Sequence, residues 1–477
     1  MKRAIHLLLI TIIFASCKKS FLETMPKGSL LATKVSDYDL LLNNKQLYDQ
    51  SVGLPSLLLG DDVGAEQAIF QNQPARCQLA FRWAADWYQG SDVAVEFNLY
   101  TTNLYSCNKV INEVMKAEGD NDSIKKMLRA EALANRAYYT FQLAGFYTKP
   151  YNPSTAATDA GFPAITRAEI NQSYQRGTVQ QTYDFIIKDL TDAITDLPAK
   201  QRVYTRFSKP AAQCLLGKVY LFMGRYNDAL SQFDAAMAGV PATEVSLYDY
   251  NTAFADGGAF LPVGLFGPLY PNSNNTDFKE SLLVKINAGG SILGGGFGND
   301  GLSLDPKMQS LYSASDLRLK LYSTTYFNGT SIPGGRLRKY GQQFVRTGVQ
   351  LQDLYLLRAE SRARTNDLTG AVQDVEYLRK NRMPVADAII PSGIASDRTA
   401  LIRLIIEERI REFAMEGYRW FDMRRLSVDP LFSTNNFTHT IFNSDGTNST
   451  FTLPVERFVL RFPPAVMIQN QQMSNNP

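Results

Sequence analysis

The sequence predicts a mostly α-helical protein, built from stacked helix hairpins, with a large irregular, loop-rich insertion and a C-terminal tail. Three observations predict this class: a hairpin repeat that occurs twice, four further segments with helical periodicity, and a loss of that periodicity between residues 240 and 350. The chain has 477 residues, of which 45% are apolar and 20% charged, so it can bury a large hydrophobic core.

The repeat is clearest in residues 213–241, where the sequence fits the tetratricopeptide pattern closely. Small side chains at Gly217 and Ala229 allow two antiparallel helices to approach each other. A weaker copy keeps the same 12-residue spacing between Ala359 and Ala371. Both copies predict a tetratricopeptide-like helix hairpin. The matching positions of the first copy are Leu216, Gly217, Tyr220, Gly224, Tyr226, Ala229, Phe233, Ala236 and Pro241.

Apolar residues three and four apart predict four more helices, at 97–115, 124–147, 179–197 and 399–415. Residues 240–350 instead contain clustered Gly, Pro and Asn, which is typical of irregular loops. We therefore expect a signal peptide (1–16), a lipidated tether and N-terminal segment (17–34), a helical tetratricopeptide-like region (35–239), an irregular ligand-side insertion (240–350), helical hairpins with a charged strut (351–426), and a tail packed on the body (427–477).

The N-terminus has the pattern of a bacterial lipoprotein signal. Lys2 and Arg3 precede an apolar run, 4–15, that is too short to span a bilayer, and Cys17 follows small residues. Cys17 is therefore the expected lipid attachment site, and an ordinary secretory signal with an incidental Cys17 is the alternative. Cleavage before Cys17 would leave a nearly neutral chain, which argues against a nucleic-acid partner.

Cysteine and histidine usage restricts the possible chemistry. Cys77, Cys107 and Cys214 lack Cys-x-x-Cys spacing, so we expect three buried thiols, with a Cys77–Cys107 bridge left open, and no metal site or cofactor. His439 would be the only histidine of the mature chain, in a polar loop, which disfavours a Ser-His-Asp or Cys-His mechanism. Carboxylate-only chemistry, as in glycosidases, stays open.

The densest cluster of charge, residues 405–426, predicts an internal strut. Apolar residues surround its Glu and Arg positions on the helical wheel, and buried charges of opposite sign can satisfy one another. The alternatives are an exposed charged face or a catalytic role for Glu408, Glu412 or Asp422. Trp420, inside this segment, is expected to belong to the core.

Several motifs together resemble the SusD/RagB family of Bacteroidetes outer-membrane nutrient-binding lipoproteins. They are ERIREFAMEGYRWFDMRR (408–425), RAEALANRAYYTFQLAGFY (129–147), CKKSFLETMPKG (17–28) and the terminal FPPAVMIQNQQMSNNP. The resemblance covers essentially the whole chain, and the C-terminal motif is the most specific.

The resemblance implies a glycan-binding lipoprotein on the outer-membrane surface that acts as a lid over a SusC-like TonB-dependent transporter. It also implies binding without catalysis, with the helix hairpins facing the transporter and the ligand on the irregular side. Ligand residues of the family vary with the substrate, so none can be transferred to a position in this chain.

Sugars stack on flat aromatic faces and bond to amide, carboxylate and guanidinium groups, which suggests candidate ligand residues. The leading candidates are Trp83 and Trp87, with Trp87 the best-placed exposed stacking residue. Polar or aromatic neighbours in the same stretch are Arg82, Asp86, Tyr88, Gln89 and Asp92. Candidates of second rank, in the insertion, are Tyr270, Asn272, Asn274, Phe278 and Phe297.

Three other functions stay open at this stage. A member of the same family could capture peptide in place of glycan, and charge and aromatic content do not separate the two. A helical-repeat adaptor would bind only protein and would leave the aromatic candidates without a ligand. A carboxylate-dependent glycosidase would release reducing ends, which a binding protein does not.

Overall fold

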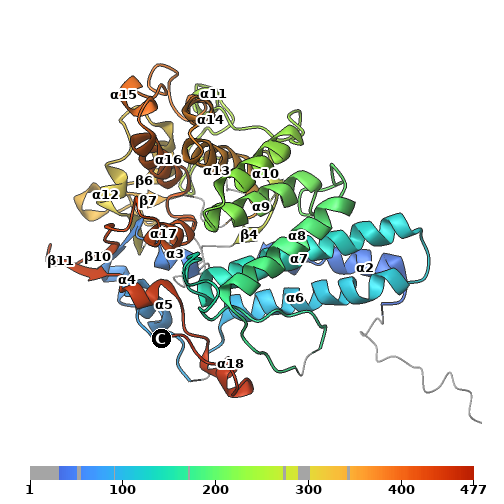
Figure 1. The fold of residues 1–477 in the computed structure, drawn as a ribbon. Helices are drawn as coiled ribbons and strands as arrows, with labels where there is room; N and C mark the ends of the chain where they lie inside the picture. The colour runs from blue at the N-terminus through green and yellow to red at the C-terminus, as the bar shows by residue number, and fades with distance from the viewer. Residues whose placement is uncertain are drawn as a thin grey trace, which may run out of the picture.

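The computed structural model describes residues 32–50, 55–90, 92–169, 172–271, 276–287, 301–340 and 344–477. These residues form a mostly helical structure with a few short strands, as the sequence predicts (Figure 1). Two motifs of the sequence, the N-terminal signal with Cys17 and the glycine-rich stretch that includes Phe297, lie outside the described residues.

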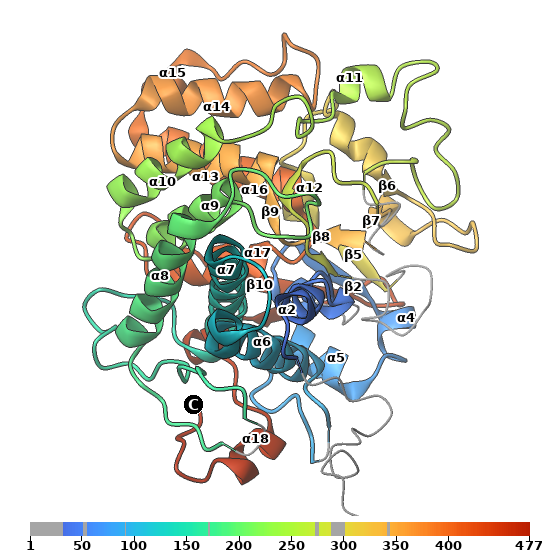
Figure 2. The ribbon, with the colours of Figure 1, turned by 90° about the vertical axis from the view of Figure 1, so that its right-hand side faces the viewer.

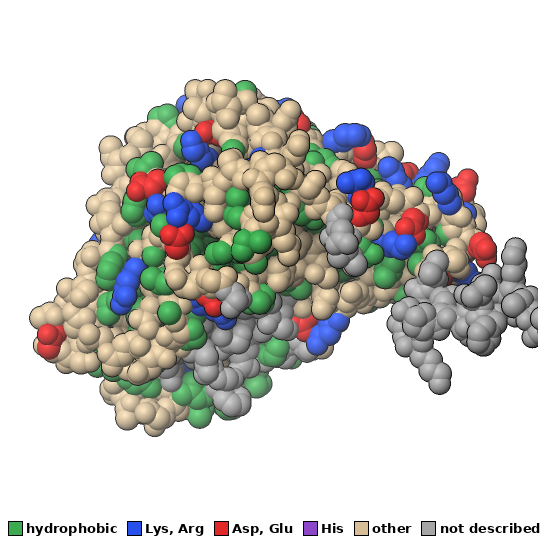
Figure 3. Space-filling model, turned by 90° about the horizontal axis from the view of Figure 1, so that it is seen from below, with side chains coloured by type: hydrophobic (Ala, Val, Ile, Leu, Met, Phe, Trp, Pro, Cys, Tyr) green, Lys and Arg blue, Asp and Glu red, His purple; other side chains and the backbone are tan. Residues whose placement is uncertain are grey.

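The three longest helices, together with the shorter α2, form an arm on one side of the molecule (Figure 1). Viewed end-on, α7 is surrounded by its neighbours on the arm (Figure 2), and seen from below Lys, Arg, Asp and Glu side chains gather over the arm (Figure 3). The helices predicted at 97–115, 124–147 and 179–197 are confirmed, because each observed helix begins and ends within two residues of the predicted bounds. The arm helices are α2 (Val35–Leu42), α6 (Val95–Glu113), α7 (Asp122–Tyr147) and α8 (Val179–Asp196).

Helix hairpins continue the stack from α8. The first predicted hairpin is α9 and α10, which turn at Gly224 with a positive φ of 74°. A Cβ on Gly217 would lie 2.7 Å from the ring of Phe233, so the close approach of these helices requires glycine there. Both predicted hairpins are confirmed. The helices are α9 (Lys209–Phe222), α10 (Tyr226–Ala238), α13 (Leu351–Arg364), α14 (Leu368–Lys380), α16 (Arg398–Phe413) and α17 (Arg419–Ser427).

A four-stranded sheet joins distant parts of the chain, in the order β11-β10-β2-β5. Strand β10 is antiparallel to β11 and parallel to β2, with Ile441 opposite Ala65. The tail thus contributes a hairpin to the body. The strands are β1 (Asp49–Gln50), β2 (Val63–Glu66), β3 (Ser281–Leu283), β4 (Ile286–Asn287), β5 (Leu302–Leu304), β6 (Tyr322–Ser323), β7 (Arg338–Lys339), β8 (Val345–Arg346), β9 (Val349–Gln350), β10 (Thr438–Phe442) and β11 (Asn448–Thr452).

The remaining helices are short and lie mainly near the strands, in the described part of 240–350, or in the tail. They are α3 (Pro55–Leu59), α4 (Gln67–Phe70), α5 (Ala75–Phe81), α11 (Tyr250–Ala253), α12 (Pro306–Gln309), α15 (Ser392–Ala395) and α18 (Pro464–Gln469). Short 3-10 turns are η2 (Lys45–Leu47), η3 (Val114–Lys116), η5 (Leu317–Leu321), η6 (Pro333–Gly335) and η8 (Val455–Phe458).

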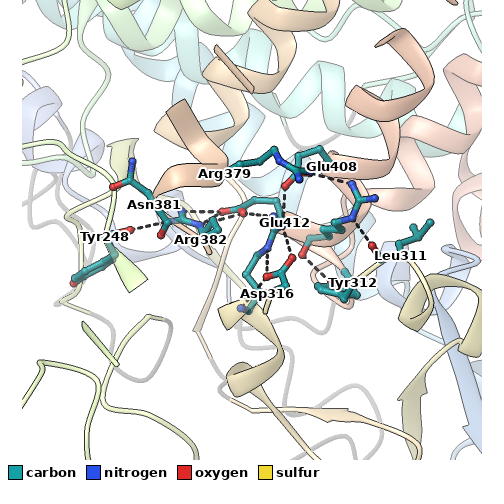
Figure 4. A network of polar contacts seen from close by, with 12 residues as sticks. Tyr248, Leu311, Tyr312, Asp316, Arg379, Asn381, Arg382, Glu408 and Glu412 are labelled. Carbon is teal, nitrogen blue, oxygen red and sulfur yellow. Dashed lines mark hydrogen bonds and ion pairs between the residues drawn. The ribbon is translucent and has the colours of Figure 1, made fainter. Parts of the chain in front are cut away.

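The charged helix α16 forms the predicted internal strut (Figure 4). Glu408 is fully buried and contacts Arg318 at 2.7 Å and both Arg379 and Arg411 at 3.0 Å. Burial alone would raise the pKa of the Glu408 carboxyl, but the charges of these arginines lower it to about 2. Trp420 is also fully buried. Both predictions for this segment are confirmed.

Glu412 and Asp422, the two other acids of the strut that the sequence suggested as possible catalytic residues, are also paired with arginines. Glu412 contacts Arg382 at 2.8 Å, and Asp422 contacts Arg409 at 2.9 Å and Arg425 at 2.8 Å. Each of these carboxylates is committed to guanidinium partners inside the protein.

The sequence also makes structural predictions for His439 and for the three cysteines. The expectation that His439 lies in a polar loop is wrong, because His439 belongs to β10 and is fully buried. Cys77, Cys107 and Cys214 are buried, as predicted, and Cys107 and Cys214 are free thiols. A Cys77–Cys107 bridge is therefore not formed.

Candidate functional site

The described part of the insertion presents a group of exposed apolar side chains. Leu265, Phe266 and Leu269 are 54%, 55% and 51% exposed. The ring of Phe266 packs on that of Phe327, with the centroids 5.1 Å apart. We call Leu265, Phe266, Leu269, Phe327 and Tyr340 the insertion platform. Exposed apolar side chains that cluster in this way usually mark a binding surface.

A tight turn places two of these side chains at its tip. Gly264 and Gly267 exchange backbone hydrogen bonds of 3.0 Å, so Leu265 and Phe266 form the two-residue loop between them. Gly267 has a φ of +98°, and a Cβ there would lie 2.4 Å from Cβ of Tyr340. Only glycine can therefore bring this turn against Tyr340.

A second hairpin supplies the rest of the insertion platform. The chain after α11 runs beside β6 and β7 (Figure 2). Between these strands, Tyr326 donates a backbone hydrogen bond of 2.8 Å to Thr330, which closes the turn next to Phe327. The guanidinium of Arg338 lies 4.9 Å from the ring of Phe327 and 5.3 Å from that of Tyr340. Arg338 thus holds the two rings in place from β7.

The platform presents apolar side chains, among them the exposed ring of Phe266. Arg338 is only 2% exposed and donates a 3.0 Å hydrogen bond to the carbonyl of Thr325, so it supports the rings and is not open to a ligand. Aromatic faces of this kind stack on the C–H surfaces of sugar rings. The arrangement suits a ligand that is apolar on one face.

The candidates Tyr270 and Phe278, of second rank in the sequence, are both half-buried. Tyr270 packs on Tyr248 and Phe260, with centroids 6.0 and 6.3 Å apart, so part of its ring is used inside the insertion. Its neighbour Tyr248 donates a 2.8 Å hydrogen bond to Asp277. Burial and the charge of Asp277 raise the pKa of Tyr248, which therefore stays a neutral hydroxyl.

The other candidates from the insertion, Asn272, Asn274 and Phe297, lie outside the described residues. Their part in ligand binding stays a prediction.

The leading candidate Trp83 is not a surface residue. Its side chain is 3% exposed, its indole N–H donates a 3.1 Å hydrogen bond to the carbonyl of Leu59, and its ring stacks on His439 at 3.9 Å. The other face of His439 stacks on Phe81 at 4.2 Å. Trp83 is thus one layer of a buried aromatic stack.

The prediction that Trp87 is an exposed stacking residue is also wrong. Trp87 is 5% exposed and packs on Tyr88 with centroids 5.0 Å apart. The hydroxyl of Tyr88 donates a 2.5 Å hydrogen bond to buried Glu96. The physical reason is tertiary: parts of the tail pack over this stretch and use its aromatic rings as core.

The polar candidates of the same stretch do lie at the surface. Arg82, Asp86 and Gln89 are exposed. Asp86 pairs with Arg461 of the tail at 2.9 Å, the guanidinium of Arg82 lies 5.6 Å from the ring of Phe451, and Gln89 donates a 2.8 Å bond to the carbonyl of Asp86. These groups therefore connect the stretch to the tail, and no exposed aromatic face from Trp83, Trp87 or Tyr88 accompanies them.

Sequence reasoning missed the insertion platform, although a signal for it exists. The run PVGLFGPLYP, residues 262–271, places Leu and Phe between two glycines and two prolines. Large apolar residues in such a turn have no helix or strand face on which to be buried, so exposure could have been expected.

No group of three or more His, Cys, Asp or Glu side chains in the described ranges could hold a metal ion. Likewise, none of the helices that the structure describes is long and apolar enough to cross a membrane.

Comparison with protein-family models gives two matches. The SusD-like model described as "Starch-binding associating with outer membrane" matches residues 62–221, and the SusD family model matches residues 350–476. Together they span more than half of the chain. SusD-like protein P38 of Formosa agariphila is 22% identical over 311 residues, or 56% of this chain. The chain spans 62% of the length of that curated relative, which is less than two thirds.

Solved structures share the fold at low sequence identity. A SusD superfamily protein of Bacteroides thetaiotaomicron has a TM-score of 0.70 at 19% identity, covering 93% of this chain and 100% of the other. Surface glycan-binding protein A of Bacteroides fluxus has a TM-score of 0.65 at 16% identity, covering 94% and 100%. With this mostly helical fold and both family matches, the chain belongs to the SusD/RagB family.

Proposed function

We propose that this protein binds glycan nutrients, oligosaccharide or polysaccharide, at the outer membrane and delivers them to a SusC-like TonB-dependent transporter. The observation that carries the proposal is the insertion platform, an apolar surface on a SusD-like fold in which Phe266 is exposed and packs on half-buried Phe327. Family membership supports association with the outer membrane, and the neighbour from Bacteroides fluxus is described as glycan-binding. In this proposal Cys17 carries the lipid anchor and the protein faces the cell surface.

The proposal is one of binding without cleavage. A glycosidase needs two carboxyl groups that flank the scissile bond, one of them with a raised pKa. In the strut, the carboxylates of Glu408, Glu412 and Asp422 are buried against arginines, and the pKa of each lies below its usual value because of those charges, although burial opposes the shift. They support the structure and are not available to a sugar.

Binding is tested by affinity electrophoresis of residues 18–477 in gels that contain starch, plant or host polysaccharides, with reducing-end release assayed in parallel. Removal of the two packed rings in the Phe266→Ala/Phe327→Ala variant should weaken retention about thirtyfold, because each ring contributes about 1 kcal/mol and about 1.4 kcal/mol corresponds to a factor of ten. Tyr105→Ala on α6, where the side chain is 39% exposed, is the matched control and should behave as wild type.

The result decides among the alternatives. If the gel retains the platform variant as strongly as the wild type, the platform is not the binding site. Release of reducing ends would indicate a glycosidase, and binding of peptides alone would indicate the peptide-capturing branch of the family.

The anchor and the partner need separate tests. Cys17→Ala should move the full-length protein from the membrane fraction to the soluble fraction, and unchanged partitioning would reject lipid attachment. Co-purification of a TonB-dependent transporter with the wild-type protein, from detergent-solubilised outer membranes, tests delivery; a protein that purifies alone from such membranes would speak against it.

A further inference from the structure

A cavity of about 600 Å³ lies apart from the insertion platform and shares no lining residue with it. Three segments surround it: 149–159 after α7, 427–437 between α17 and β10, and 453–459 after β11. The volume falls within the range of pockets that bind small organic ligands. Neither the sequence motifs nor the family matches assign a function to it.

Aromatic rings lie beneath the cavity. Phe432, Phe437 and Phe458 border it and are only 4%, 5% and 7% exposed. Phe437 and Phe458 pack edge to face with centroids 5.8 Å apart and an interplanar angle of 85°. These rings therefore support the cavity from inside the protein, and its apolar surface comes from Val428 and Val455, which are 38% and 83% exposed.

Groups that bond to hydroxyls stand along the rim. Asn435 and Asn436 are exposed, and their side-chain amides make no hydrogen bond within the described part of the chain. Across the cavity, Lys149 and Asp159 form an ion pair at 2.6 Å, and exposed Glu456 follows β11. The rim thus offers both donors and acceptors, and one lysine against two acids gives its side chains a net charge of about −1.

The walls are held in place by buried hydrogen bonds. The guanidinium of Arg424, 5% exposed, donates to the backbone carbonyls of Ala144, Thr148 and Phe458. It thereby joins the start of segment 149–159 to segment 453–459. Within segment 427–437, the backbone N–H of Phe432 donates a 2.9 Å hydrogen bond to the carbonyl of Asp429, and that of Asn435 donates one of the same length to the carbonyl of Phe432.

We propose that this cavity binds a short neutral oligosaccharide of two or three rings, as a second saccharide site. The exposed apolar side chains of Val428 and Val455 fit the C–H surface of a sugar, while amides, carboxylates and an ammonium group on the rim fit its hydroxyls. The slight excess of negative charge on the rim disfavours an acidic saccharide, so the ligand is a neutral one. A preformed cavity needs little ordering on binding, which favours small ligands. The proposal rests on the proposed glycan-binding function for its ligand class.

The test uses maltotriose, cellotriose and xylotriose as probes, with calorimetric titration of residues 18–477 and crystals soaked in each. Asn435→Ala/Asn436→Ala removes two hydroxyl-bonding amides and should lower the affinity for the bound trisaccharide about tenfold. Val428→Trp places a large ring at a cavity residue that is 38% exposed, and should abolish binding. Asn98→Ala, an exposed position on α6, is the matched control.

Trisaccharide density in the cavity, with loss of affinity in both cavity variants only, is the expected result. Trisaccharide binding that the cavity variants leave unchanged, or no trisaccharide binding at all, would overturn the second site. In those cases, polysaccharide retention that depends on Phe266 and Phe327 would still support the proposed function. The reverse pattern, trisaccharide in the cavity without polysaccharide retention, would support the second site and remove the platform proposal.

Discussion

Lys285 provides the sharpest test of the electrostatics of this fold. Its ammonium group is fully buried, 2.5 Å from the carbonyl oxygen of Leu47, 2.8 Å from Oδ1 of Asn135 and 3.4 Å from the hydroxyl of Tyr139. These are neutral acceptors, so no carboxylate contacts the charge directly. Burial lowers the pKa of Lys285 from 10.5 to about 7, and the more distant Glu131 opposes that shift only in part.

The sign of the pH dependence follows from this shift. Between pH 7 and 10.5 the unfolded chain carries a proton on Lys285 that the folded protein has released, so the free energy of unfolding rises with pH. Each pKa unit corresponds to about 1.36 kcal/mol, so the rise between pH 7 and pH 9 is about 2 kcal/mol. Below pH 7 both states are protonated and the contribution becomes constant.

The assay is equilibrium urea unfolding of the wild type and Lys285→Met at pH 6, 7, 8 and 9. Other groups titrate equally in both proteins, so the difference between the two free energies of unfolding isolates Lys285. We expect this difference to shift by about 2 kcal/mol in favour of the wild type from pH 7 to pH 9. Lys126→Met, exposed on α7, is the control and should show no such shift. A flat difference for Lys285→Met would refute the reasoning, because Lys285 would then keep its proton in the folded state.

Three further predictions concern the strut, the platform and the misplaced tryptophan. Glu408→Gln should lower the free energy of unfolding by about 3–5 kcal/mol, since it leaves buried arginines such as Arg318 without their charge partner. Because the pKa of Glu408 is about 2, its contribution is complete above pH 4.5 and lost as the pH falls toward 2, so the variant and wild type should converge in acid; a pH-independent difference would contradict this. Gly267→Ala should weaken polysaccharide retention, because the added Cβ meets Tyr340 at 2.4 Å; retention equal to wild type would show that the turn does not position the rings. Trp87→Ala should cost about 3–5 kcal/mol in chemical unfolding, as for a core residue, and an unchanged midpoint would restore Trp87 as a surface side chain.

Local patterns predicted the helical part of the fold well. The small residues at Gly217 and Ala229 and the turn at Gly224 carry the hairpin geometry within about 30 residues, so no distant contact is needed to recognise it. The strut was predictable for the same reason, because Glu408 and Arg411 lie on one helix and buried charges need partners.

The site depended on contacts that a local pattern cannot contain. Trp83 becomes core because it stacks on His439, which follows it by more than 350 residues and reaches it through the pairing of β10 with β2. The insertion platform likewise needs Phe266 and Phe327 to meet from two separate turns. Exposure of aromatic rings in this protein is decided by such long-range packing, whereas helix formation is not.

The parallel pairing of β10 with β2 also constrains how the chain reaches its native state. Strand β2 ends at residue 66, and its parallel neighbour in the sheet does not exist until residues 438–442 have been made. Until then one edge of β2 and the ring faces of Phe81 and Trp83 lack their cover. A chain still in synthesis therefore exposes an unpaired strand edge until nearly all of it has been made, and such an edge can pair with another chain and aggregate.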